Sequence, residues 1–195
     1  VCWQDLESSG VLGFDTETRP AFKKGLKYPT ALVQLATGSE CWVFQMLGIS
    51  DDVKERLQSI LTSREIVKAG VGIRQDLQEL MESHFPKMRC AEGVVELEEI
   101  AKLSGAPKRG LKPLVATFLN CTMKKPKKVQ LSNWAQPKLT GSQMKYAALD
   151  AWAGRQLYQR FSELFGQSEV WASSQETVQN KLGSVAVNSS QETVQ

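Results

Sequence analysis

The chain has 195 residues, of which 42% are hydrophobic and 23% are charged, a composition typical of a folded globular domain. It is long enough to bury one sizeable core. The formal net charge of +3 is too small to indicate a class of partner. No run of about 20 apolar residues occurs, so the sequence predicts no membrane-spanning helix and no membrane partner.

Cysteine and histidine usage excludes several kinds of site. The four cysteines lie far apart and form no CxxC pair, which argues against a zinc ribbon or a disulfide scaffold. Cysteines of this kind favour a reducing compartment, so we expect a cytoplasmic protein, or a nuclear one in a eukaryote. The single histidine, His84, excludes any site that needs two imidazoles.

The first part of the chain has the residue pattern of β-strands. Apolar runs predict strands at 11–17, 31–37 and 41–46, the last two forming a hairpin across the turn at 38–40. A short apolar run at 66–70 predicts a fourth, buried strand.

Helical spacing of apolar residues dominates the remainder up to residue 166. A long helix begins with a capping box, in which Thr140 is the N-cap and Gln143 lies three residues on. Strands, one strand–helix crossover and then packed helices predict an α/β domain with a central sheet. The expected helices cover 49–63, 71–84, 95–105, 111–120 and 140–166, and 121–138 is expected to be a loop.

Beyond Gly166 the composition changes. The heptapeptide SSQETVQ occurs twice, at 173–179 and 189–195, which is too few copies for a solenoid. We therefore expect one domain over 1–166 and a Ser/Gln/Val-rich C-terminal tail over 167–195.

Two carboxylates end the first predicted strand, in the stretch VLGFDTETRP. Because strand side chains alternate between faces, Asp15 and Glu17 point the same way. Like charges roughly 4 Å apart repel by about 4 kcal/mol at an effective dielectric near 20. Taken alone, such a pair is more often a solvated turn than a ligand pair.

Three further polar residues stand out in the predicted helices. Asp76 lies near the start of the helix that follows KAGVG, where the helix dipole alone would favour an acid. Tyr146 and Asp150 are four residues apart, so they share one helix face, and alone they are equally a buried hydrogen-bonded pair. The alanines and glycine around them would let this helix press against a sheet.

Four segments together resemble the DEDD superfamily of 3′–5′ exonucleases: FDTET, KAGVGIRQD, LSNWAQPKLT and YAALDAWAG. The resemblance covers 11–162 and is closest to ribonuclease D-like and Werner-exonuclease-like members, and the opening GFDTETRP also resembles bacterial 3′–5′ exonuclease-domain proteins. Tyr146, four residues before the last acid, matches the tyrosine subtype, whereas the histidine subtype has His where this chain has Lys145. The resemblance implies a ribonuclease H-like mixed β-sheet flanked by α-helices.

The resemblance also implies a two-metal mechanism. Asp15 would bridge two ions, Glu17 and Asp150 would complete one site, and Asp76 would act on the other through water. Tyr146 would orient the attacking water. Carboxylates without a His or Cys cluster suit Mg²⁺ or Mn²⁺ rather than zinc. The reaction would hydrolyse DNA or RNA from the 3′ end and release nucleoside 5′-monophosphates.

A basic segment precedes the last predicted helix and can flank such a site. Lysines there would bind the phosphate backbone without reading sequence, although a solvated surface or a nuclear import signal explains them equally well. An aromatic residue in the segment could stack on a base, but core packing is favoured. The candidate nucleic-acid contacts are Lys124, Lys125, Lys127, Lys128, Trp134 and Lys138, and weaker candidates lie in the basic stretch 19–27.

Two other functions stay open at this point. A nucleic-acid-binding module of the same fold could lack catalysis, although all four acids and the tyrosine are present. A haloacid-dehalogenase-like phosphatase also places a motif similar to DTET at a strand end, but its second acid is Asp where this chain has Glu17.

Overall fold

A computed structural model describes residues 1–166 of the chain, and the predicted tail with its two SSQETVQ copies lies outside the described residues. A five-stranded sheet runs through the molecule in the order β3-β2-β1-β4-β5. Strands β1, β2 and β3 pair antiparallel, while β4 pairs parallel to β1 and β5 parallel to β4. The strands are β1 (Val11–Thr18), β2 (Thr30–Ala36), β3 (Cys41–Gln45), β4 (Val67–Gly70) and β5 (Val94–Glu96).

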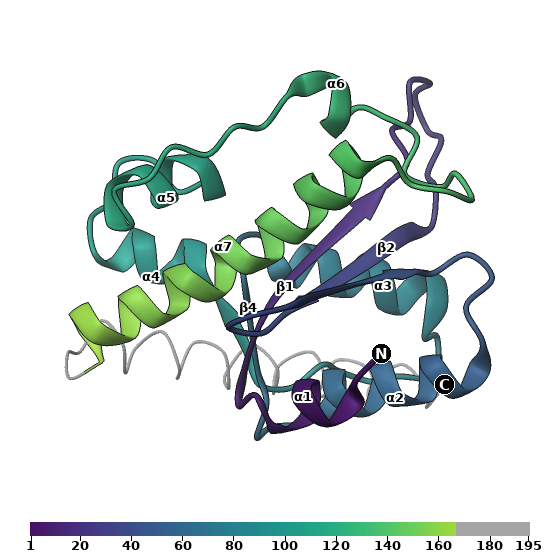
Figure 1. The fold of residues 1–195 in the computed structure, drawn as a ribbon, viewed down its shortest axis with the longest axis horizontal. Helices are drawn as coiled ribbons and strands as arrows, with labels where there is room; N and C mark the ends of the chain where they lie inside the picture. The colour runs from purple at the N-terminus through teal and green to yellow at the C-terminus, as the bar shows by residue number, and fades with distance from the viewer. Residues whose placement is uncertain (167–195) are drawn as a thin grey trace, which may run out of the picture.

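The two faces of the sheet are covered by different helices (Figure 1). One face packs against α1 (Trp3–Ser8), α2 (Asp51–Thr62) and α3 (Ile73–His84) through an apolar cluster that includes Leu12 and Phe14 of β1. The opposite face carries the long helix α7, with α4 and α5 beside it. The remaining helices are α4 (Leu97–Leu103), α5 (Leu111–Phe118), α6 (Lys127–Gln130) and α7 (Gly141–Phe165). This is the predicted mixed sheet flanked by helices.

Glycines allow α7 to lie directly on the sheet. A Cβ atom added at Gly13 of β1 would lie 1.9 Å from the carbonyl oxygen of Ala151, a distance that atoms do not reach. On α7 itself, a Cβ at Gly154 would lie 3.1 Å from the carbonyl oxygen of Ala69 in β4. Because Gly13, Asp15 and Glu17 share one face of β1, the same contact brings α7 over the two acids.

The described elements differ from the prediction at three places. Residues 94–96 pair with β4 as strand β5, although the sequence predicted a helix from residue 95. Three residues are too few to reveal the two-residue period of a strand, and a helix follows directly. The sequence therefore indicated a helix over the whole segment. Helix α1 and the short helix α6 were not predicted, and α6 lies within the expected loop at 121–138.

Two further sequence expectations concern the cysteines and membrane-spanning helices. All four cysteines are free in the structure. None of the helices formed by residues 1–166 has the length and apolar character needed to cross a membrane.

Candidate active site

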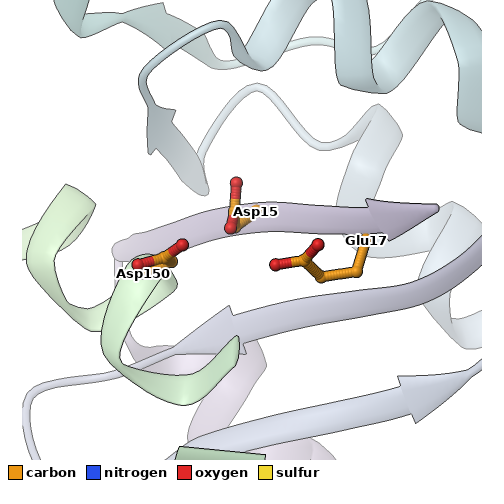
Figure 2. Close-up of side chains that lie close together, drawn as sticks. All are labelled: Asp15, Glu17 and Asp150. Carbon is orange, nitrogen blue, oxygen red and sulfur yellow. The ribbon is translucent and has the colours of Figure 1, made fainter. Parts of the chain in front are cut away.

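Three carboxylates from two elements converge where β1 meets α7. Asp15 and Glu17 come from β1 and Asp150 comes from the facing helix, as Figure 2 shows. One oxygen from each carboxylate lies within 4.8 Å of the others. The face of β1 that was predicted to carry Asp15 and Glu17 therefore lies against the face of α7 that carries Asp150. We call these three residues the acidic cluster.

Asp76 lies beside the acidic cluster but outside it. It sits in the first turn of α3, which covers the other face of the sheet, and its carboxylate accepts a hydrogen bond from the Thr16 side chain. Its charge nevertheless acts on Asp15 and Glu17. The N-cap of α3 is Gly72, whose φ of 79° is left-handed and suits glycine.

Electrostatics make the acidic cluster costly without a counter-charge. Burial raises the pKa of Asp15 well above its usual value, and the charges of Asp150 and Asp76 raise it further. Burial also raises the pKa of Glu17 to about 8, with Asp150 adding to the increase and Lys125 opposing it. Burial raises the pKa of Asp150 above its usual value, although the charge and hydrogen bond of Lys125 oppose the increase. A bound cation would relieve both the repulsion and the lost solvation.

Tyr146 lies one turn before Asp150 on the same face of α7. Its side chain is buried, and its ring packs against Trp134 with the centroids 5.7 Å apart. Burial and the charge of Asp150 raise the pKa of the phenol to about 12. The hydroxyl therefore keeps its proton at neutral pH, which suits the orientation of a water better than proton abstraction.

Lys125 is the basic residue that enters the site. Its Nζ lies 2.6 Å from Oδ2 of Asp150 and 5.1 Å from the centre of the Tyr146 ring. Burial lowers the pKa of the Lys125 ammonium, but the charge and hydrogen bond of Asp150 outweigh this and raise it above its ordinary value. The ammonium thus stays charged and supplies part of the counter-charge of the acidic cluster.

The other candidate nucleic-acid contacts fall into two groups. The side chain of Trp134 is 0% exposed, and its Nε1 donates a hydrogen bond to the backbone oxygen of Gln130 at 3.1 Å. A base cannot stack on a ring in this position, so Trp134 takes the packing role that the sequence favoured. The lysines on the surface are exposed and available to a phosphate backbone: Lys124, Lys127, Lys128 and Lys138.

Sequence reasoning overlooked Gln34, which lies opposite Asp15 in the register of β1 and β2. The two side chains therefore share a face of the sheet. Gln34 is 0% exposed, and neither amide atom has a hydrogen-bond partner among residues 1–166. Its apolar setting in ALVQLAT gave no sign of this position, because strand register cannot be read from the sequence.

The donor set fits a hard divalent cation. All three groups of the acidic cluster are carboxylates. His84 is not among them, and its Nε2 lies 2.7 Å from the backbone oxygen of Thr30. Carboxylate oxygens are the ligands that Mg²⁺ and Mn²⁺ prefer.

Comparison with known proteins identifies the family of this chain. The profile of a family described as 3′–5′ exonuclease matches residues 2–165, which is nearly the whole described chain. This match confirms the predicted family and excludes the phosphatase alternative.

Curated relatives carry the same description. The chain is 35% identical over 170 residues to the bifunctional 3′–5′ exonuclease/ATP-dependent helicase WRN of Mus musculus, covering 86% of this chain and 12% of that protein. It is 32% identical over 162 residues to a 3′–5′ exonuclease of Arabidopsis thaliana, covering 81% of this chain and 55% of the relative. The chain therefore spans only part of the length of these two proteins.

Solved structures share the fold. Brucella melitensis NrnC bound to pGG has a TM-score of 0.77 and 21% sequence identity, covering 98% of this chain and 90% of NrnC. The same protein with bound Mg²⁺ has a TM-score of 0.73 at 20% identity, with the same coverage. These similarities confirm the predicted ribonuclease H-like sheet flanked by helices, and the family match over residues 2–165 shows that the chain belongs to the 3′–5′ exonuclease domain family.

Proposed function

We propose that the acidic cluster is the catalytic centre of this exonuclease domain and holds two divalent cations, Mg²⁺ or Mn²⁺. The observation that carries the proposal is the convergence of Asp15, Glu17 and Asp150 within 4.8 Å. Bound at such a site, two divalent ions would activate the attacking water and neutralise charge on the attacked and leaving oxygens. The magnesium bound to NrnC, a protein of the same fold, supports this choice of ion.

The protein groups would divide the work by position. The charges of Asp150, Asp76 and Glu17 all act on Asp15, which would therefore help to hold both ions, while Glu17 and Asp150 would complete one site. Asp76 would act through water, since it lies outside the acidic cluster and is held by Thr16. Tyr146 would hydrogen-bond the attacking water with its protonated hydroxyl.

We propose nucleic acid as the substrate, entering with its 3′ end at the acidic cluster. The exposed lysines at 124, 127, 128 and 138 would hold the phosphate backbone, and their contacts would carry no sequence information. The binding of pGG to NrnC, which has the same fold, supports a nucleic-acid partner. The free cysteines support a reducing compartment, the cytoplasm or a nucleus.

The test is degradation of a 5′-labelled single strand of DNA or RNA in Mg²⁺ or Mn²⁺. Asp15→Asn keeps the size of the side chain but removes its charge, and Asp51→Asn on the exposed start of α2 is the matched control. We expect a descending ladder from the wild type and from Asp51→Asn, and none with chelator or Asp15→Asn. Strand binding without any ladder would instead support a catalytically silent module of the same fold.

A further inference from the structure

Lys125 differs from the other lysines of its segment in where its side chain lies. Its side chain is only 23% exposed and contacts a carboxylate of the acidic cluster, whereas Lys124, Lys127 and Lys128 are exposed. Its backbone is anchored on both sides. Met123, two residues earlier, is 4% exposed within the apolar cluster under α7, and Pro126 is the N-cap of α6. A flexible four-carbon side chain on a fixed backbone can reach more than one partner.

The partner of Lys125 is an oxygen that the proposed metal site also needs. The Nζ lies 2.6 Å from Oδ2 of Asp150, a residue only 4% exposed, and the ammonium lies over the Tyr146 ring. A cation that binds the acidic cluster therefore meets a positive charge already placed on one of its ligands. Two positive charges that share one ligand oxygen repel each other, more strongly in a partly buried site than in bulk water.

Cations bound at the acidic cluster would remove most of its negative charge. Asp15, Glu17, Asp150 and the neighbouring Asp76 carry at most four negative charges, which two divalent cations would balance. Lys125 would then be held less strongly by Asp150 and would be attracted to a phosphodiester bound at the site. Two negative partners would thus compete for the single positive charge of Lys125.

We propose that Lys125 is a positioning residue that exchanges partners, pairing with Asp150 before cations bind and with a phosphate of the bound strand afterwards. The proposal rests on the proposed function of the acidic cluster. It predicts that Lys125 weakens cation binding and strengthens strand binding, whereas a purely structural lysine would do neither.

The first experiment measures Mn²⁺ affinity by electron paramagnetic resonance, without nucleic acid. Lys125→Met removes the charge and keeps a long apolar side chain, and Lys125→Arg keeps the charge. Lys112→Met, at an exposed lysine of α5, is the control. We expect Mn²⁺ to bind about threefold to tenfold more tightly to Lys125→Met than to the wild type, because a screened like charge is lost. Lys125→Arg and Lys112→Met should match the wild type. Lys125→Gln replaces Lys125→Met if that variant does not fold.

The second experiment measures the affinity of two cleavage-resistant strands in Mn²⁺. One carries a charged phosphorothioate at its 3′-terminal linkage and the other a neutral methylphosphonate. The wild type should prefer the charged linkage, and Lys125→Met should lose about threefold or more of that preference, whereas Lys112→Met should keep it. This double comparison isolates the contact between Lys125 and the phosphate.

The outcomes separate the two proposals. If Lys125→Met binds Mn²⁺ as the wild type does, or keeps the full preference for the charged linkage, the exchange of partners is wrong while the metal site stands. If the wild type binds no Mn²⁺ and degrades no strand, the proposed function itself is wrong.

Discussion

The carbonyl oxygen of Ala151 occupies the space that a side chain at Gly13 would need, since a Cβ there would lie only 1.9 Å from it. This contact seats α7 on β1 and sets the distance between Asp150 and the two acids of the strand. The absence of a side chain at Gly13 therefore allows the acidic cluster to form.

Gly13→Ala should damage stability and metal binding together. The methyl group must push α7 away from β1, and overpacking of this kind typically costs about 1–3 kcal/mol of unfolding free energy. Because α7 carries Asp150, we also expect Mn²⁺ affinity to fall. Urea unfolding and Mn²⁺ titration measure the two effects.

The control for this variant is Gly141→Ala, at the first residue of α7, where an added Cβ meets nothing within 4 Å. It should change stability by less than about 1 kcal/mol and leave Mn²⁺ affinity unchanged. If Gly13→Ala behaved like Gly141→Ala, close contact would not position the acidic cluster.

In chelator, the stability of the domain should fall as the pH rises from about 4.5 to 8. The pKa of Glu17 is raised by burial from 4.5 to about 8, and that of Asp76 from 3.8 to about 7. The folded state therefore holds more protons than the unfolded state in this window, so the free energy of unfolding falls with increasing pH.

The measurement for this pH dependence is urea unfolding at pH 5, 6.5 and 8, in chelator and in Mg²⁺. Bound cations should flatten the decline, because they offset the same charges that raise the pKa values. A decline of equal size in both solutions would mean that Mg²⁺ does not bind among these acids.

Tyr146→Phe should slow hydrolysis while leaving metal affinity nearly unchanged. The variant removes only the hydroxyl, which would orient the attacking water, and keeps the ring that packs against Trp134. Since burial raises the pKa of the phenol to about 12, Tyr146 should stay protonated between pH 7 and 9. The pH dependence of the wild-type rate should therefore contain no step from this group in that range. Single-turnover cleavage and Mn²⁺ titration test this. Equal rates for the two proteins would remove the hydroxyl from the mechanism.

The capping box should stabilise the start of α7, the helix that carries Tyr146 and Asp150. The backbone N–H of Gln143 donates to the Thr140 hydroxyl at 3.2 Å, and the Gln143 side chain accepts from the Thr140 N–H at 2.9 Å. Thr140→Ala should cost about 1 kcal/mol of stability, as loss of an N-cap usually does. Thermal unfolding measures this against the exposed Ser142→Ala, which should change the melting temperature little. Similar losses in both variants would contradict a role for the cap.

Local patterns predicted the parts of the site that lie within one element. The period of two in β1 placed Asp15 and Glu17 on one face, and the spacing of four placed Tyr146 beside Asp150 on α7. The capping box at Thr140 was read correctly because it involves only neighbours in the chain. The family resemblance then joined these fragments into one site.

Relations between elements were beyond reach because they depend on how the chain packs. The register that places Gln34 opposite Asp15 is a property of two strands, and nothing in ALVQLAT indicates it. The sequence alone did not distinguish Lys125 from its neighbouring lysines, because its contact with Asp150 depends on the position of α7. The sequence favoured packing for Trp134 but did not indicate its packing partner, Tyr146, which lies on another element.

The most direct test of the acidic cluster is a crystal structure of the domain grown with Mn²⁺, with the ions located by their anomalous scattering. Our account predicts strong anomalous peaks within coordination distance of Asp15, Glu17 and Asp150, and loss of those peaks in Asp15→Asn. Saturating Mn²⁺ that supports cleavage but gives no peak among these three carboxylates would contradict it.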